Sequence, residues 1–407
     1  MARWVAAATD AIWRTIVFRA PAFLTVLLAS GAPAAAHHGP GTFDLSKSVT
    51  YPDATLTRVE LINPHSWLYF EVADENGRVS RHRCEMRSVH VLRRSGWTGD
   101  LFRAGQRMTV NASPDRRDPN SCYLQTILFE DGSRMDRYGQ YVKAPQGGIR
   151  EVRGPLVVPS TQRALRRPTG EPNLSGEWAP EQRVMVDPRG VGGGLVRLGQ
   201  LSELERGGRP ARAGGARRGG GPAAGPRLYG GTELTARGEA AAASFTREDT
   251  PRFRCETTSI VFDWTFDGPI NRITQDRDTI LVEYGQMNLR RTIHMNMKAH
   301  PADVEPSRTG HSIGRWEGDV LVVDTVGFLP GVLNAPVRHG AQLHVVERFS
   351  LDPATMTLTR AYVAEDPEYL KGQYAGSDEV QIADAPYAED TCKEQGFIDF
   401  SEQVRQP

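Results

Sequence analysis

Five histidines lie between residues 294 and 344, and they are the side chains of this sequence best suited to ligand binding or proton transfer. They are His294, His300, His311, His339 and His344. Imidazole changes its protonation state near neutral pH, and a neighbouring carboxylate can complete a pair that moves a proton. Asp324 and Glu347 supply carboxylates in the same stretch. The candidate catalytic residues are therefore His294, His311, Asp324, His344 and Glu347.

Strand alternation predicts which of these side chains share a face, because successive residues of a strand point to opposite sides. Over 290–297 the alternation places His294 opposite Arg291, and over 343–349 it places His344 opposite Glu347. The alternative for any single histidine here is a position on a solvated polar face without a function, because such faces are common on antiparallel sheets. An inward charge needs a partner. We expect structural ion pairs, either between Glu347 and Arg291 or between Asp324 and Arg348.

A metal hypothesis concerns His37, His38 and His65. Signal-peptide cleavage after Ala36 would place His37 first, so that its amine and imidazole chelate a metal, with His38 or His65 as a third ligand. Cleavage after Ala34 would place His37 third, which gives the four nitrogen ligands of a square-planar copper site. Copper is thus the one cofactor that the sequence suggests. The alternative to a functional site is that an N-terminal histidine binds copper adventitiously and the two histidines only mark a flexible leader.

His65 lies in the segment Asn63-Pro64-His65-Ser66-Trp67, between two expected strands. Proline interrupts a strand ladder, so this segment is a turn, a bulge or an edge. One interpretation is that the break directs His65 into a pocket. The other is an ordinary turn, in which Asn63 bonds the local backbone and Trp67 fills the core.

Motifs of metalloproteases and nucleotide-binding enzymes are missing from the sequence. One G-x-S-x-G run is present at 310–314 (GHSIG), but it runs into an expected strand and not into the strand-to-helix turn of a nucleophilic serine. The sequence contains no Ser-x-x-Lys or H-E-x-x-H, and the glycines at 192–194 lie in a loop without the strand–helix context of a phosphate site. The sequence therefore does not identify a reaction.

The first 36 residues have the three parts of a secretory signal. Arginines come first, an apolar run covers 22–29, and small residues with two A-x-A sites end at Ala36. The apolar run is well below the roughly 20 residues that span a bilayer. We expect cleavage, a periplasmic or secreted protein and no stable membrane insertion.

Four cysteines fit an exported chain with disulfides, and they allow three pairings. We favour Cys84 with Cys122 and Cys255 with Cys392, because a long flexible segment separates the two pairs. The alternative is four buried thiols.

Composition divides the chain into segments. Lys plus Arg equals Asp plus Glu, at 49 each, so net charge indicates no class of partner. Residues 206–227 are nearly all Gly, Ala, Pro and Arg, which predicts a disordered, solvated linker. In an exported protein this run does not indicate a nucleic-acid partner. The expected parts are a signal peptide (1–36), a first domain (37–145), a connector with the first strand of the second domain (146–180), a disordered insertion (181–233) and a second domain (234–400).

Both domains are expected to be mainly β. Strand-like segments over 50–72, 79–87, 105–111 and 123–129, with a short helix over 88–94, predict a small closed barrel of the OB type. After an alanine-rich helix near 235–245, short strands separated by tight turns predict a larger antiparallel barrel or sandwich. Gly176 and Trp178 match the opening motif of lipocalin-type barrels, or Trp178 is simply a core residue.

Two family resemblances accompany these patterns. His37-His38, Asn63-Pro64-His65-Ser66-Trp67 and residues 92–97 (LRRSGW) are similar to the DUF6152 family of exported bacterial proteins. The run GHSIGRWEGDVLVVDTVGF (310–328), with Glu347-Arg348-Phe349, resembles a second exported bacterial group without assigned chemistry. Both resemblances imply fold and export, and neither implies a reaction.

These observations favour an exported, non-enzymatic protein that binds a small ligand and carries a copper-binding terminus. The alternative is an isomerase, hydratase or lyase with a His/carboxylate pocket inside the second barrel. Oligomeric state is not readable from the sequence.

Overall fold

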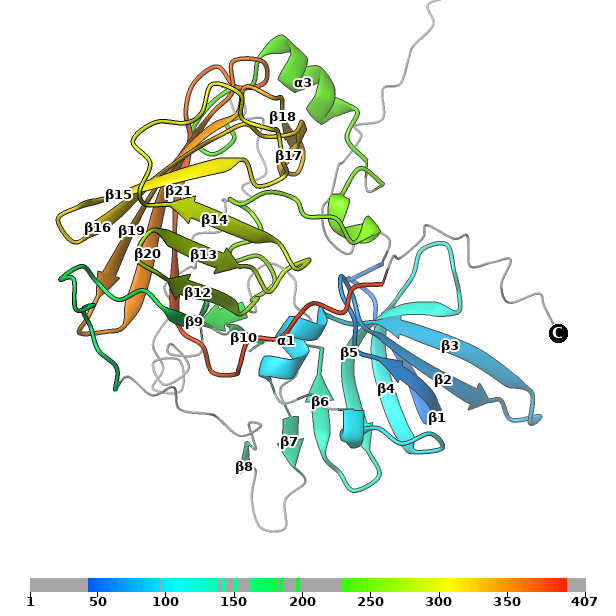
Figure 1. The fold of residues 1–407 in the computed structure, drawn as a ribbon. Coiled ribbons are helices and arrows are strands. Elements are labelled where there is room, and N and C mark those ends of the chain that lie inside the picture. Colours follow the sequence, from blue (N-terminus) through cyan, green and yellow to red (C-terminus); the bar gives the residue numbers. More distant parts are fainter. Residues whose placement is uncertain are drawn as a thin grey trace, which may run out of the picture. The chain divides into compact units, whose positions relative to one another are not determined.

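The computed structural model describes residues 43–137 (without 96 and 98), 141–143, 150–151, 162–181, 183–185, 195–197 and 228–393 (without 247). The expected signal peptide and the histidines at 37 and 38 lie outside these residues. The described chain is mainly β, with two barrels that follow one another along the sequence (Figure 1). No helix in it is long and apolar enough to cross a membrane.

The first barrel has five strands, and it confirms the predicted OB-type architecture. The strands are β1 (Val49–Glu60), β2 (Trp67–Ala73), β3 (Val79–Glu85), β4 (Arg107–Pro114) and β5 (Ser121–Phe129). β1 pairs with β2 and β4, and a parallel pairing of β3 with β5 closes the ring. The short helix α1 (Val89–Arg94) and the turn η1 (Gly99–Leu101) connect β3 to β4. Antiparallel extensions β6 (Arg134–Asp136), β7 (Tyr141–Lys143) and β8 (Arg150–Glu151) continue from β5.

Alternating apolar residues fill this barrel. Leu56 of β1 lies opposite Phe70 of β2, and both side chains are buried. Trp97, which follows α1, is buried as well. Cys84 and Cys122 face each other where β3 meets β5, and they form a disulfide. The expected pairing is therefore confirmed here, and the second disulfide joins Cys255 to Cys392.

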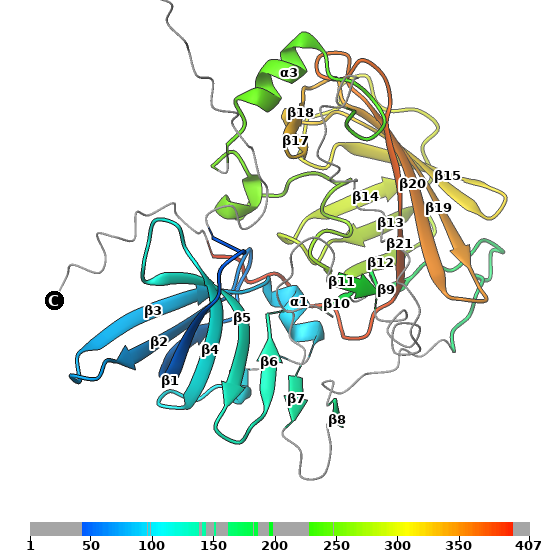
Figure 2. The ribbon, with the colours of Figure 1, turned by 180° about the vertical axis from the view of Figure 1, so that it is seen from behind.

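The second barrel has nine strands. They are β9 (Gly176–Ala179), β12 (Asn271–Gln275), β13 (Thr279–Glu283), β14 (Arg290–His294), β15 (His311–Glu317), β16 (Val320–Val326), β19 (His344–Asp352), β20 (Thr357–Glu365) and β21 (Tyr374–Ile382). Each neighbouring pair in this ring is antiparallel except β14 and β15, which are parallel. Figure 2 shows the same ring from behind. The predicted antiparallel barrel is confirmed, with this one parallel step added.

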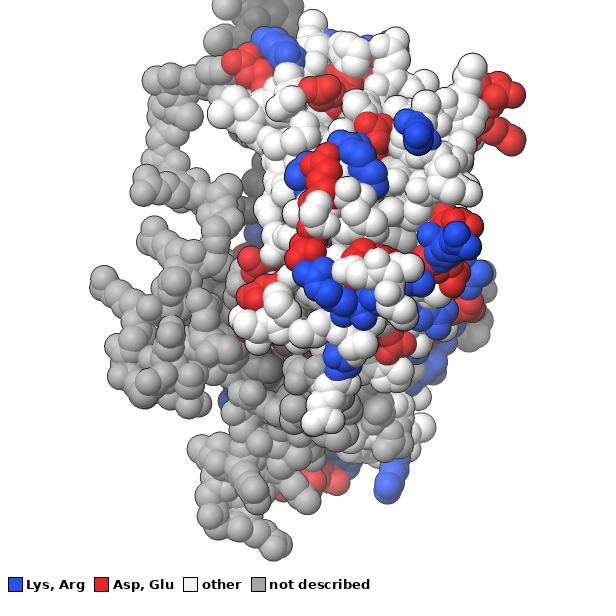
Figure 3. Space-filling model, turned by 60° about the vertical axis from the view of Figure 1, so that its left-hand side comes forward, with Lys and Arg blue, Asp and Glu red and all other residues white. Residues whose placement is uncertain are grey.

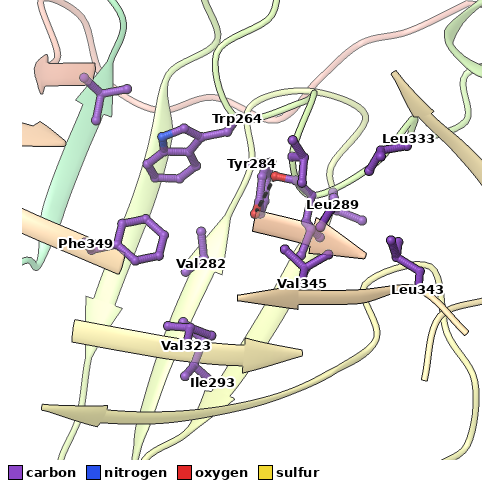
Figure 4. Packing of buried hydrophobic residues seen from close by; sticks show 14 of the residues in the cluster. Trp264, Val282, Tyr284, Leu289, Ile293, Val323, Leu333, Leu343, Val345 and Phe349 are labelled. Atoms are coloured by element: carbon purple, nitrogen blue, oxygen red, sulfur yellow. Dashed lines mark hydrogen bonds between the residues drawn. The ribbon is translucent and has the colours of Figure 1, made fainter. Parts of the chain in front are cut away.

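Side chains fill the described interior of the second barrel. Figure 4 shows part of this core, which includes Trp264, Val282, Tyr284, Val323, Val345 and Phe349. Trp178, from the Gly-x-Trp segment, is also fully buried there. Burial of this much apolar surface is the main driving force for closing the barrel.

Short elements surround the second barrel. Thr235 caps the N-terminus of α3 (Ala236–Ala243), and its side-chain oxygen accepts a hydrogen bond from the Gly238 amide. The turn η3 (Pro251–Arg254) precedes Cys255, and β17 (Gly331–Asn334) pairs with β18 (Val337–His339) beside α3 (Figure 1). Within the range predicted to be disordered, β10 (Arg183–Met185) and β11 (Leu195–Arg197) form a two-stranded sheet. Residues 198–227 lie outside the described residues, so most of the linker prediction is not addressed.

Candidate functional site

Strand register brings four of the predicted residues to one face of the second barrel. His294 of β14 lies opposite Ile313 of β15, and Ile313 lies opposite Asp324 of β16. Asp324 in turn lies opposite Val346 of β19. Residues two apart share a face, so His311 joins Ile313 and His344 joins Val346. The inward positions beside them, such as Ile293, Thr325 and Val345, are buried, so this shared face is the outer one.

A long connection adds the fifth member. Residues 295–310 link the parallel strands β14 and β15, and His300 lies within them. Parallel neighbours need such a crossover because a tight turn cannot join them. We call His294, His300, His311, Asp324 and His344 the histidine cluster.

Hydrogen bonds tie the histidine cluster together. Asp324 Oδ1 lies 3.0 Å from His300 Nε2 and 3.1 Å from His344 Nε2. His300 Nδ1 lies 2.8 Å from His311 Nδ1. The His311 ring also stacks on that of His294, with 5.0 Å between the ring centroids. Five side chains from separate segments thus form one continuous polar group.

The carboxylate sets the protonation of the neighbouring rings. Burial raises the pKa of Asp324, but the hydrogen bonds from His300 and His344 outweigh it and hold the pKa below its ordinary value. An ionised carboxylate only accepts hydrogen bonds, so both Nε2 atoms carry protons. In a neutral His300 the Nδ1 atom is then an acceptor, and His311 donates its Nδ1 proton to it. His311 Nε2 is consequently left with a lone pair.

Burial and like charge lower the pKa of His311. Desolvation is the largest cause, and the neighbouring His294 and His300 add to it. His311 therefore favours its neutral, basic form near neutral pH. The histidine cluster is accessible to ligands, since the side chains of His344, Asp324 and His300 are 38%, 29% and 17% exposed.

Glu347 and His339 lie away from the histidine cluster. Glu347 points into the barrel, where its carboxylate lies 2.6 Å from Arg291 Nη2 and 3.2 Å from Arg360 Nη1. The predicted ion pair between Glu347 and Arg291 is thus confirmed, and it makes Glu347 a core residue. His339 of β18 is buried, with its ring edge-to-face with Phe328.

The alternative ion pair between Asp324 and Arg348 is wrong. Asp324 bonds histidines, and Arg348 Nη1 lies 2.9 Å from Glu317 Oε2 on β15, across the intervening strand β16. Arg348 lies opposite Val322, two residues from Asp324 along β16, and its guanidinium contacts Glu317 instead. Arg360 and Asp378 were missed as core charges. The signal for Arg360 was its position two residues from Leu358, which places both on the inward face of β20.

His65 does not join the histidine cluster. Its Nδ1 atom lies 2.7 Å from Glu85 Oε1, and both side chains are largely buried. Trp67 is only partly buried, so Trp97 is the core tryptophan of this barrel. Because His37 and His38 lie outside the described residues, the three-histidine copper site stays a prediction.

No three His, Cys, Asp or Glu side chains in the described residues already surround a metal position. In the histidine cluster hydrogen bonds hold the nitrogen atoms instead.

A separate cavity of about 310 Å³ lies elsewhere, lined by His90, Arg93, Arg94, Gly268, Ile270, Ala385, Pro386 and Ala388. It contains none of the predicted site residues. Acidic and basic side chains are intermingled on the described part of the face in Figure 3.

Comparison with known proteins supports the first resemblance only. Residues 25–122, about a quarter of the chain, match a family described as a family of unknown function, DUF6152. No curated protein and no solved structure matches the chain. The resemblance of the second barrel to a further exported group stays a prediction.

Proposed function

We propose that this protein is an exported binding protein and that the histidine cluster on its second barrel is the ligand site. One observation carries the proposal. Four imidazoles and a carboxylate, supplied by four strands and a crossover, converge in a partly exposed group. Polar side chains that only solvate a sheet face have no need for such convergence.

Export is part of the same proposal. The basic, apolar and small-residue parts of the N-terminus support a cleaved signal. The two disulfides are compatible with an oxidising compartment such as the periplasm or the exterior. N-terminal sequencing of the protein recovered from outside the cytoplasm tests this step. An intact N-terminus on cytoplasmic protein would contradict it.

The filled core favours a ligand site on the outside of the barrel. Ligand sites are usually concave and enclosed, yet side chains occupy the described interior here. An open site of imidazoles and a carboxylate suits a small polar or ionic ligand better than a large apolar one. We therefore expect a ligand that the ring nitrogens contact directly.

The test is thermal unfolding of the mature protein with a panel of probes that includes divalent metal ions, inorganic phosphate and small carboxylates. We expect at least one probe to raise the unfolding temperature, because a ligand of the folded state stabilises it. The increase should be lost in H311Q and D324N and kept in E317Q, which removes a carboxylate from the same outer face. Stabilisation that survives both cluster variants would place the ligand elsewhere.

A second candidate function is acid–base catalysis of the isomerase, hydratase or lyase type. The observation that favours it is the hydrogen-bonded series from Asp324 through His300 to His311, which leaves a basic nitrogen at its end. Proton transfer needs a base that is held in a fixed tautomer, and the lowered pKa of His311 keeps its ring unprotonated near neutral pH. Reaction with diethyl pyrocarbonate measures the basicity of that nitrogen, and D324N should slow the modification of His311. Equal rates would argue against the relay.

A copper-binding terminus is a separate proposal. The residues that support it are His37 and His38 beside two expected cleavage sites. Cu(II) titration of the mature protein should show tight binding that is lost when one residue precedes the native terminus. Unchanged binding would rule out the terminal amine as a ligand.

A further inference from the structure

We propose that the cavity beside α1 is a second ligand site and that it takes a small monocarboxylate with an apolar body. This inference goes beyond the proposed function, because none of the residues that line the cavity belongs to the histidine cluster. Three segments form the walls: α1, residues 268–270 before β12, and residues 385–388 after β21. We call this space the α1 cavity.

Hydrogen bonds and a disulfide hold the walls of the α1 cavity in place. Arg94 Nε and Nη2 donate to the two carboxylate oxygens of Asp384, at 2.9 and 3.3 Å, and Arg94 Nη1 donates to the Gly268 carbonyl at 3.2 Å. Arg94 thus ties both other walls to α1. Beyond the far end of the wall after β21, Cys392 is bonded to Cys255. A site whose walls are fixed before the ligand arrives avoids part of the entropic cost of binding.

One positive charge in the α1 cavity lacks a counter-charge. Arg93 and Arg94 both lie in the last turn of α1 and line the cavity, and Asp384 neutralises Arg94. His90 lies 3.6 Å from the Asp390 carboxylate, so a charge on its ring would also be matched. The exposed Arg93 forms no ion pair with a described residue. This single guanidinium calls for one negative charge on the ligand, and its planar fork fits a carboxylate.

The rest of the lining is apolar and leaves room for the body of the ligand. Its members are Ile270, Ala385, Pro386 and Ala388. The Tyr387 side chain does not fill the space, because its ring packs against Arg272, with 4.4 Å between the guanidinium carbon and the ring centroid.

The size and composition of the α1 cavity suit a small organic ligand. Its volume of about 310 Å³ is at the lower end of the range for ligand pockets, roughly 300–1,000 Å³. Such pockets combine a mainly apolar lining with a few placed polar groups, as this one does. An inorganic anion would satisfy Arg93 but would leave the apolar lining uncovered.

The experiment is calorimetric titration of the mature protein with benzoate. Two matched probes separate charge from apolar contact, because benzamide has the ring without the charge and acetate has the charge without the ring. We expect benzoate to bind at least about 10-fold more tightly than either probe, since only benzoate uses both features of the α1 cavity.

Variants test each feature separately. R93Q should weaken benzoate binding about 10-fold, the usual effect of losing a hydrogen bond to a charged group. R93K keeps the charge and should weaken it less. A388L fills the cavity without changing the charge and should also reduce binding. The controls are R103Q and A104L, at exposed positions of the first barrel outside the cavity lining, and both should bind benzoate like wild type.

H311Q shows whether the α1 cavity and the histidine cluster are separate sites, and it should bind benzoate like wild type. Binding that is lost in H311Q but unchanged in R93Q and A388L would place the carboxylate at the histidine cluster and overturn the inference. Absence of benzoate binding, or equal binding of benzoate and either matched probe, would overturn it as well. Circular dichroism verifies that each variant is folded, as expected for substitutions at the exposed Arg93 and Ala388.

Discussion

Arg291 and Glu347 form an ion pair inside the second barrel, with 2.6 Å between Arg291 Nη2 and Glu347 Oε2 and side-chain exposures of 1% and 0%. The other oxygen of Glu347 contacts Arg360, which also bonds Asp378. Burying charge is costly, and each partner reduces the cost of the others. Burial lowers the pKa of Arg291, but the nearby Glu347 outweighs it, so the net pKa is raised and the guanidinium stays charged.

E347Q should destabilise the protein by about 3–5 kcal/mol, because it leaves two buried guanidinium groups without their shared counter-charge. Urea unfolding followed by tryptophan fluorescence measures the change. The control is E379Q on β21, an exposed position of the same barrel, where we expect a change within about 0.5 kcal/mol. Equal unfolding midpoints for the two variants would show that the pair does not compensate the buried charges.

Asp263 should make the protein less stable as the pH rises from about 4 to about 7. Burial raises the pKa of this carboxyl to about 7 in the folded state, despite a hydrogen bond from the Thr258 amide. Over that window the unfolded chain has released the proton and the folded chain still holds it, so the free energy of unfolding falls with pH. Above about pH 7 this contribution levels off.

Urea unfolding at several pH values compares wild type with D263N, which keeps an acceptor oxygen but cannot ionise. The fall between pH 4 and 7 should be smaller in D263N. D303N, at an exposed position, should retain the wild-type slope. Parallel curves for wild type and D263N would contradict the assignment.

Removing the disulfide between Cys255 and Cys392 should cost roughly 2–5 kcal/mol. Its two cysteines are 137 residues apart, so the bond restricts a long loop of the unfolded chain. The measurement is the unfolding midpoint of C255A/C392A against wild type under non-reducing conditions. A reducing agent should then have less effect on this variant than on wild type, because only Cys84–Cys122 remains. An unchanged midpoint would show that the bond contributes little.

H294Q should raise the pKa of His311. Burial is the main reason that this pKa is low, and the charge on His294 is the next largest. Replacing His294 removes that repulsion, so His311 should protonate at a higher pH. NMR titration of the ring C2 proton measures the shift, and H82Q in the first barrel is the control. A lowered or unchanged pKa would show that the stacked rings do not repel each other.

Sequence patterns predicted the strands well but not the closure of the rings. Alternation between apolar and polar residues placed strands close to 279–283, 320–326 and 357–365, because each strand buries only one face. The pairings of β3 with β5 and of β14 with β15 depend on residues distant in sequence, and local patterns carry no signal for them. The hairpin of β17 and β18 was missed because its strands have only four and three residues.

The sequence predicted part of the histidine cluster. The density of histidines suggested convergence, and alternation separated His344 from Glu347 as the structure does. Alternation could not tell which face is the lumen, because Ile313, Val322 and Val346 give the outer face an apolar character too. His300 lies in a loop without periodicity, so its contacts with Asp324 and His311 could not be anticipated.

The odd number of strands in the second barrel has a topological consequence. Strands that alternate up and down can close a ring without interruption only when their number is even. Nine strands therefore force at least one seam at which two neighbours run the same way, and this seam lies between β14 and β15. The polypeptide must return along the barrel wall to cross it, and that return segment carries His300. An odd strand number therefore requires a connection here that is longer than the tight turns of an antiparallel ring.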